Sequence, residues 1–313
     1  MKLKAILSLV LAGLSTSSAF AFPVGRTVSL DFFRAPAKRS LRGDKVNFEG
    51  IVALSNCSGA IVRYETGRPS DQAMVLTNGH CNEGGLIDPG TFLMNEATNR
   101  QFAVLDPADG RSLGRITAEK IIYGTMTKTD ITLYRVKETY QQIMDKFRVR
   151  PLTLASRQAA EGTKIEIVSG YWKTGYSCAI DYFVDTLKED AWTMRNSIKY
   201  TQPGCHTIHG TSGSPIVAAG TDKVIGINNT GNDDGEKCTM DNPCEIDRNG
   251  KVTVQKGASY GQNIYYLYSC IDSQDRFDLK IKGCRLPGGD AANTPNIRRV
   301  SLRAPHGASR SHR

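Results

Sequence analysis

Histidine, serine and aspartate are the side chains from which this 313-residue chain could build a site for acyl transfer. Such chemistry needs a nucleophilic hydroxyl, a neutral imidazole to accept its proton, a carboxylate to orient the imidazole, and two N–H donors for the oxyanion. The chain has five histidines, and His80 is the only one in its first half. Two others stand shortly before Ser212, and the last two lie near the C-terminus. His80 is therefore the candidate base.

The candidate nucleophile, Ser212, lies in the glycine-rich stretch HGTSGSP at 209–215. Glycines on both sides let the backbone turn sharply and leave room for a substrate carbonyl. The N–H groups of Gly210 and Ser212 could then point into one space and bind an oxyanion. A Gly-x-Ser-Gly string is a weak signal by itself, because glycine and serine are common in any turn.

The candidate carboxylate, Asp130, opens the strand-like run DITLYRV at 130–136. An aspartate before a strand is more often a solvated turn residue, so its chain order carries the argument. The order His, Asp, Ser differs from the two other common orders of this triad, Asp-His-Ser and Ser-acid-His. Ser214 also occupies the position where the hydrolase elbow G-x-S-x-G needs its second glycine.

Short extended segments must position these residues. Between about residues 46 and 287, short β-rich runs alternate with Gly, Asn, Asp and Pro, which is typical of an all-β barrel or sandwich. One stretch, 137–147, predicts a helix near the midpoint and so suggests two halves of comparable size. The clearest predicted strands are 48–54, 60–64, 73–77, 131–136, 164–168, 215–218, 224–228 and 263–268.

Three sequence boxes around the candidate residues resemble those of the chymotrypsin-like (trypsin-fold) serine peptidases. They are LTNGHC at 76–81, DITLYRV at 130–136 and GTSGSP at 210–215, and two more segments, NCSGAIV at 56–62 and IVSGYW at 167–172, also resemble family strands. The resemblance spans roughly residues 46 to 275. It implies two six-stranded antiparallel barrels, about 46–150 and about 151–287, with the active site in the cleft between them.

The same resemblance implies the role of each residue. His80 accepts the proton of Ser212 and later donates it to the leaving amine, while Asp130 fixes the imidazole tautomer. The N–H groups of Gly210 and Ser212 bind the oxyanion. His80 and Asp130 would come from the first barrel and Ser212 from the second.

Eight cysteines in an exported chain predict four disulfides, although eight allow 105 pairings on sequence alone. The resemblance implies that Cys57 pairs with Cys81 and closes the loop that holds His80. Local proximity favours Cys178–Cys205, Cys238–Cys244 and Cys270–Cys284. The chain has no CxxC pair, so we expect neither a metal site nor a cofactor.

One departure from the family pattern lies beside the nucleophile. Thr211 stands where trypsin and chymotrypsin carry the aspartate that pairs with the new amino terminus. That activation mechanism is therefore closed to this chain. The departure, together with the Gly-Ser-Pro ending, resembles the bacterial glutamyl-endopeptidase branch.

The pocket for the residue before the scissile bond should be formed by residues 206–209 and 228–231. His206 at its base makes a trypsin-like preference for Arg or Lys unexpected, and an acidic preference through His206 or His209 is one hypothesis. The alternative is that both histidines have no part in selectivity. Within these two segments the named candidates are His206, Thr207, His209, Asn228, Asn229, Thr230 and Gly231. Asn229 and Thr230 replace a serine and a large aromatic of the relatives, which puts the substrate-binding edge in doubt.

Residues 232–258 form an insertion at the pocket rim. It contains several oxygen-bearing side chains that could bind calcium, but their spacing lacks an EF-hand loop, so solvated turns are the favoured interpretation. The candidates are Asp241, Asn242, Glu245 and Asp247.

The two ends of the chain differ in composition from its middle. Residues 1–21 predict an export signal, since Lys2 and Lys4 precede a short apolar run and a small-x-small cleavage site. Residues 22–45 are a basic extension that could be a pro-segment or an arm packed on the barrels. Residues 288–313 carry five arginines against one aspartate and predict a disordered tail.

Together these features predict a secreted or periplasmic, monomeric serine endopeptidase that acts on proteins or peptides. The formal net charge of +9 is concentrated at the ends of the chain, so we expect no nucleic-acid partner. No segment after the leader approaches the ~20 apolar residues that cross a bilayer, so we expect no membrane partner either. The rival interpretation is a catalytically inactive protease fold used for binding or adhesion.

Overall fold

The computed structural model describes residues 46–292 and 297–302. The expected leader (1–21), the N-terminal extension (22–45) and residues 303–313 lie outside these ranges. No helix among the described residues is long and apolar enough to span a bilayer.

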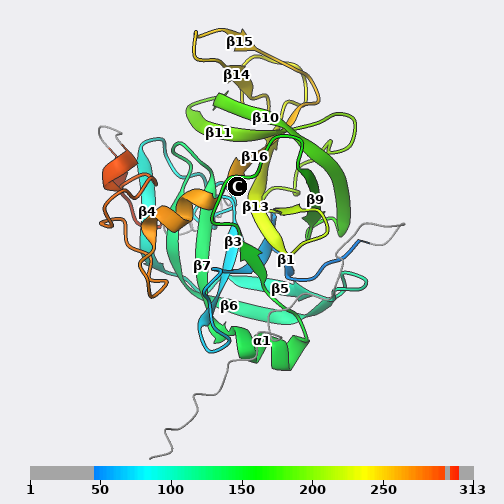
Figure 1. The fold of residues 1–313 in the computed structure, drawn as a ribbon, viewed down its shortest axis with the longest axis vertical. Helices are drawn as coiled ribbons and strands as arrows, with labels where there is room; N and C mark the ends of the chain where they lie inside the picture. The colour runs from blue at the N-terminus through cyan, green and yellow to red at the C-terminus, as the bar shows by residue number, and fades with distance from the viewer. Residues whose placement is uncertain (1–45, 293–296, 303–313) are drawn as a thin grey trace, which may run out of the picture. The chain divides into compact units, whose positions relative to one another are not determined.

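The first half of the described chain forms a closed barrel of six antiparallel strands, which can be followed in Figure 1. Around the ring the order is β1-β2-β3-β7-β6-β5, and β5 pairs again with β1. The strands are β1 (Ile51–Ala53), β2 (Ser58–Arg63), β3 (Gln72–Thr77), β5 (Gln101–Leu105), β6 (Ser112–Thr125) and β7 (Ile131–Thr139). A further strand, β4 (Thr91–Ala97), pairs with the second half of β6.

The second half forms another closed antiparallel barrel of six strands. Its order is β9-β10-β11-β16-β13-β12, and β12 pairs again with β9. The strands are β9 (Lys164–Ser169), β10 (Thr174–Glu189), β11 (Trp192–Tyr200), β12 (Pro215–Ala218), β13 (Lys223–Gly231) and β16 (Ser259–Asn263). The predicted all-β fold of two six-stranded barrels is therefore confirmed.

A short connector joins the two barrels. Helix α1 (Tyr140–Phe147) begins at a capping box in which Thr139 and Gln142 exchange hydrogen bonds. The helix predicted at 137–147 thus starts three residues late, because β7 runs on through Thr139. After it, β8 (Leu152–Leu154) pairs in parallel with β2 of the first barrel and β13 of the second.

Apolar packing continues from one barrel into the other. One buried cluster takes Leu76 and Leu133 from the first barrel, Leu154 from β8, and Val217 and Ile227 from the second barrel. A smaller cluster fills the second barrel alone with isoleucines of β9 to β13 and Tyr200. Burial of this kind stabilises by about 25 cal/mol per Å² of apolar surface. It therefore holds both barrels as fixed supports for the residues between them.

The insertion 232–258 extends the second barrel rather than forming a free loop. Strands β14 (Cys244–Ile246) and β15 (Val252–Thr253) add to the edge of β10, beyond the β10–β11 hairpin in Figure 1. A buried ion pair anchors the insertion, with Lys199 Nζ 2.7 Å from Glu245 Oε1. The hydroxyl of Tyr260 also donates to Glu245 Oε1 at 2.8 Å.

Two expectations for the C-terminal region need correction. The predicted strand at 263–268 is instead the last residue of β16 followed by the 3-10 helix η2 (Tyr265–Cys270). The tail expected to be disordered from residue 288 contains the short helix η3 (Asp290–Ala292) and strand β17 (Arg298–Arg299), which pairs in parallel with β4 (Figure 1). Composition misjudged this segment because pairing with an edge strand uses backbone groups and needs few apolar side chains.

All four predicted disulfides are present. They are Cys57–Cys81, Cys178–Cys205, Cys238–Cys244 and Cys270–Cys284. The first closes the loop before His80, and the third lies inside the insertion.

Candidate active site

The His80–Asp130 pair is assembled by the loops that follow β3 and precede β7. Asp130 is 3% exposed, and its Oδ2 lies 2.7 Å from His80 Nδ1. Because an ionised carboxylate only accepts hydrogen bonds, this contact assigns the imidazole proton to Nδ1 and leaves Nε2 free to act as the base.

The second oxygen of Asp130 is held by the backbone. Its Oδ1 accepts from the N–H of Gly79 at 2.5 Å and of His80 at 3.1 Å. A Cβ at position 79 would lie 2.3 Å from the carbonyl oxygen of Thr125, so only glycine fits there. Asn78 adds a bond from its amide to the Asp130 carbonyl at 2.8 Å. The carboxylate is therefore fixed in position before any substrate binds.

The loop that carries His80 is also tied from outside. The Cys57–Cys81 disulfide joins it to β2, and Arg100, 3% exposed, donates from Nη1 to the carbonyl of Cys81 at 2.6 Å. Sequence reasoning predicted the disulfide but missed Arg100. Nothing in its sequence surroundings distinguishes this arginine from one on the surface.

The pKa of His80 is raised above its ordinary value of 6.5. Burial alone would lower it by disfavouring the imidazolium, but the charge and hydrogen bond of Asp130, aided by Glu189 and Asp241, outweigh that effect. The site thus stabilises the protonated histidine that acyl transfer creates.

Ser212 sits on a sharp turn that packs against β2. Its carbonyl accepts from the N–H of Ser58 at 2.8 Å, and the N–H of Gly213 donates to the carbonyl of Asn228 at 3.0 Å. Gly213 has φ +82°, and a Cβ there would lie 2.1 Å from the Ser58 carbonyl oxygen. The turn therefore depends on glycine, as the sequence predicted.

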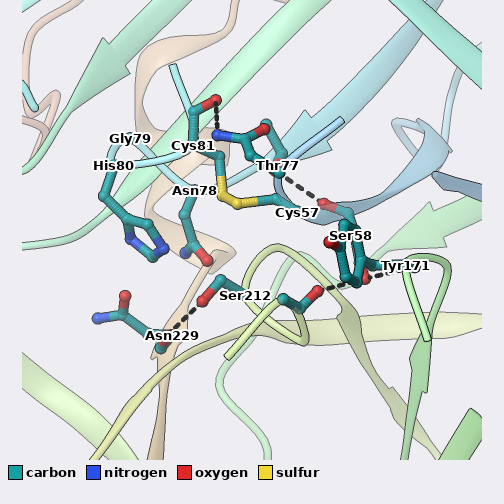
Figure 2. Close-up of a disulfide and its surroundings, with 12 residues drawn as sticks. Cys57, Ser58, Thr77, Asn78, Gly79, His80, Cys81, Tyr171, Ser212 and Asn229 are labelled. Atoms are coloured by element: carbon teal, nitrogen blue, oxygen red, sulfur yellow. Dashed lines mark hydrogen bonds between the residues drawn. A yellow bond between two sulfur atoms is a disulfide. The ribbon is translucent and has the colours of Figure 1, made fainter. Parts of the chain in front are cut away.

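The Ser212 hydroxyl donates to the carbonyl of Asn229 at 3.0 Å. Figure 2 shows this bond, with the side chains of His80, Ser212 and Asn229 turned toward the same space. No hydrogen bond among the described residues joins Ser212 to His80. Catalytic hydrogen bonds are often absent or long in unliganded enzymes and form when substrate binds.

The predicted oxyanion donors lie beside the nucleophile. Within the described part of the chain, the N–H groups of Gly210 and Ser212 donate to no other group. The Gly210 carbonyl points away, because it accepts from Ser58 Oγ at 3.0 Å. A Cβ at Gly210 would lie within 3 Å of the rings of Tyr171 and Trp172, so these two aromatic side chains pack closely against the turn.

A cleft of about 330 Å³ contains the three predicted triad residues and most of the predicted pocket residues. The predicted site residues that line this cleft are His80, Asp130, Ser212, Thr207, His209, Asn228, Asn229, Thr230 and Gly231. His206 does not line it: this residue is exposed, with Nδ1 3.2 Å from the carbonyl of Gly257. Thr207 and Asn228 are buried and bonded within the barrel, to Ser259 and Tyr200 respectively.

Of the two predicted pocket histidines, His209 lines the cleft, and carboxylates lie close to both of its ring nitrogens. Its side chain is 70% exposed, and its Nε2 lies 2.9 Å from Asp233 Oδ2. Its Nδ1 lies 4.0 Å from Asp241 Oδ1.

Glu189, at the end of β10, is a site residue that the sequence reasoning missed. It lines the cleft, is 9% exposed, and accepts from Thr230 Oγ1 at 3.1 Å and from the N–H of Asp241 at 2.9 Å. Burial raises its pKa from 4.5 to about 7, although these hydrogen bonds and His80 act in the opposite direction. The sequence around Glu189 gave no signal for this position, because closure of the second barrel brings its carboxylate to the cleft.

Three of the four calcium candidates of the insertion are bonded to other groups of the protein. Asn242 accepts from the N–H of Asp234, Glu245 pairs with Lys199, and Asp247 accepts from two N–H groups of its own turn. Asp241 faces the cleft. The structure therefore does not bring the four together as one ligand set.

Comparison with known proteins assigns the region that contains these residues to a protein family. The family model described as "Trypsin-like peptidase domain" matches residues 57–227, which is more than half of the chain. No curated protein matches the sequence.

Solved structures with a similar fold include several peptidases of low sequence identity. The MamO protease domain from Magnetospirillum magneticum is 14% identical, with a TM-score of 0.43, covering 72% of this chain and 97% of that one. A Nocardiopsis protease is 16% identical, with a TM-score of 0.40 and coverage of 69% and 90%. A glutamic-acid-specific serine protease is 15% identical, with a TM-score of 0.37 and coverage of 68% and 91%.

Proposed function

Because the chain belongs to the trypsin-like peptidase family, we propose that it is a secreted serine endopeptidase that cleaves peptide bonds through His80, Asp130 and Ser212. The observation that carries the proposal is the His80–Asp130 contact of 2.7 Å in the cleft that also contains Ser212. Four disulfides fit a chain that works outside the cytoplasm.

In this mechanism the Ser212 hydroxyl leaves the Asn229 carbonyl by rotation of its side chain and attacks the substrate carbonyl carbon. His80 Nε2 takes the hydroxyl proton, and the resulting imidazolium is stabilised by Asp130. The oxyanion accepts from the N–H groups of Gly210 and Ser212, each typically worth ~3 kcal/mol in the transition state. Collapse expels the amine with the proton from His80, and water then hydrolyses the acyl-enzyme by the same steps.

Ser212→Ala tests the proposal directly. It should lower kcat for a cleaved peptide by a factor on the order of 10⁶, because the whole triad acts as a unit. A fluorophosphonate probe should label the wild type and leave this variant unlabelled. Near-full proteolysis by Ser212→Ala would remove Ser212 from the mechanism.

One observation favours a second candidate, an inactive protease fold used for binding. The Ser212 hydroxyl is bonded to Asn229 and not to His80. If that arrangement is permanent, the purified, folded chain will not react with the fluorophosphonate probe at any pH at which His80 is neutral. Stoichiometric labelling would reject this candidate.

The acidic preference raised by the resemblance to glutamyl endopeptidases stays a prediction, with little support from the cleft. His206 lies outside it, and His209 is engaged by Asp233. Glu189 and Asp241 add negative charge to the lining. A carboxylate side chain would meet repulsion there, which leads to the opposite proposal below.

A further inference from the structure

Glu189 is a buried carboxylate in the cleft that the proposed mechanism does not use. Its hydrogen bonds from Thr230 and Asp241 both fall on Oε1. Among the described residues, no Lys, Arg or His nitrogen lies within the 4.0 Å of an ion pair with either of its oxygens. Burying a charge without a partner is costly, and a bound cation would offset that cost. The free Oε2 is therefore the natural contact for a positively charged group.

The cleft that contains Glu189 also has apolar side chains in its lining. They are Leu86, Met126, Trp192, Met194 and Met240. A bond from Trp192 Nε1 to the carbonyl of Ile87 at 2.9 Å fixes the Trp192 ring. A cleft that combines a buried carboxylate with apolar lining matches a long aliphatic stem with a charged tip, the form of lysine and arginine.

A second, independent feature indicates that a peptide lies here. Asn229 is 4% exposed and lines the cleft, yet its Nδ2 has no hydrogen-bond partner. Figure 2 shows its side chain on the same side of Ser212 as His80. An unpaired buried donor is unfavourable until it meets an acceptor, and a peptide carbonyl supplies one.

The charges nearest to Glu189 reinforce this selectivity. His80 and Asp241 are the ionisable groups that act on it, and Asp233 lies on the same lining. His80 is neutral when the enzyme is active, so the surroundings of Glu189 are then negative. Complementary charge of this kind favours cationic partners and rejects anionic ones.

We propose that Glu189 is a specificity-determining residue that binds the ammonium or guanidinium group of a substrate lysine or arginine close to the scissile bond. The inference rests on the proposed peptidase function. The aliphatic stem packs on Met126, Trp192 and Met194, and Asn229 holds the adjacent backbone. No covalent step involves Glu189.

A peptide library randomised at four positions on each side of the cut gives the first test. Lys or Arg should be enriched at one position, and acidic residues should be depleted there. Two peptides that differ only by lysine or norleucine at that position then isolate the charge. At pH 8 the wild type should prefer lysine by at least about tenfold in kcat/KM, mainly through KM.

Glu189→Gln should reduce this lysine preference to about twofold or less. Asp247→Asn, which removes an equal charge from an exposed turn outside the cleft, is the matched control and should keep the preference. A fluorophosphonate labelling rate like that of the wild type shows that the variant is folded. If a folded Glu189→Gln protein still prefers lysine, the assignment is wrong.

A measurement on the wild type alone gives a second test. The lysine-to-norleucine ratio should rise with pH through about 7, where Glu189 ionises. The ionisation of His80 affects both peptides equally and cancels in the ratio. A ratio that stays flat between pH 6 and 8, or a library without basic enrichment, would overturn the inference and leave the peptidase intact. Absence of labelling and cleavage in the wild type would instead reject the proposed function.

Discussion

Two buried carboxylates lie in one cleft, and their surroundings differ. Asp130, 3% exposed, receives backbone bonds on one oxygen and the His80 imidazole on the other. Glu189, 9% exposed, receives both of its bonds on one oxygen, and among the described residues no donor is bonded to the other. Their burial is similar, so burial does not set their roles.

The comparison teaches that the donors around a carboxylate decide what it can do. The first barrel supplies Asp130 with donors from a rigid, disulfide-closed loop, which fixes the orientation of the histidine. The second barrel presents Glu189 at the end of a hairpin, beside an insertion braced by Cys238–Cys244 and Lys199–Glu245. One carboxylate is committed to the protein, and the other keeps an oxygen for a ligand.

The largest contrast should appear in the cleavage of an uncharged peptide. Asp130→Asn should lower kcat by about 10⁴, because the amide no longer enforces the required imidazole tautomer. Glu189→Gln should change kcat for the norleucine peptide by less than about threefold, since it neither touches nor orients the reacting groups. Steady-state kinetics on both variants measures the contrast. Equal losses would mean that the two carboxylates share one role.

A smaller contrast should appear in stability. The pKa of Glu189 is raised from 4.5 to about 7, so the folded state binds this proton more tightly than the unfolded state. The contribution of Glu189 to the free energy of unfolding is therefore greatest below pH ~4.5 and falls as pH rises through about 7. Glutamine keeps the acceptor for Thr230 and does not ionise, so Glu189→Gln should be more stable than its parent by roughly 2 kcal/mol at pH 8.

Denaturant unfolding in a Ser212→Ala background, which prevents self-digestion, measures this difference without interference. The gain should shrink as pH falls toward 4.5. Asp130→Asn in the same background should show no gain at pH 8, because it loses bonds to a charged acceptor. A Glu189→Gln protein that is less stable at pH 8 would show that the carboxylate has a protein partner after all.

The sequence was sufficient for the parts of the site that depend on local chemistry. Glycines around Ser212, the cysteine after His80 and the aspartate before β7 each mark a backbone requirement, and the structure brings these residues into one cleft. The short β-rich runs predicted an all-β barrel or sandwich, and the resemblance implied the two six-stranded barrels. The helix start at Tyr140 was displaced, because strand pairing continued through residues that also favour a helix.

The sequence was insufficient where distant strands meet. Glu189 lies 109 residues after His80 and 23 residues before Ser212 in the chain. Only closure of the second barrel brings its carboxylate into the cleft with His80. His206 failed as a pocket residue for the same reason, since one residue along an irregular loop reverses the side to which a side chain points. Spacing along the chain contains no information about such contacts.

The smallest contrast should appear in the pH dependence of the histidine. The pKa of His80 is raised even though burial opposes it, with Asp130 as the main cause and Glu189 a lesser one. In the proposed mechanism neutral His80 is the base, so activity should increase with pH, and the midpoint of kcat/KM should lie above the ordinary ~6.5. Glu189→Gln removes one negative charge near the imidazole and should move that midpoint downward, while activity should still fall at acidic pH.

Asp247→Asn, on its exposed turn outside the cleft, should leave the midpoint in place. Profiles measured on the norleucine peptide separate this effect from substrate charge, and an unchanged midpoint in Glu189→Gln would show that the carboxylate is already neutral when His80 titrates.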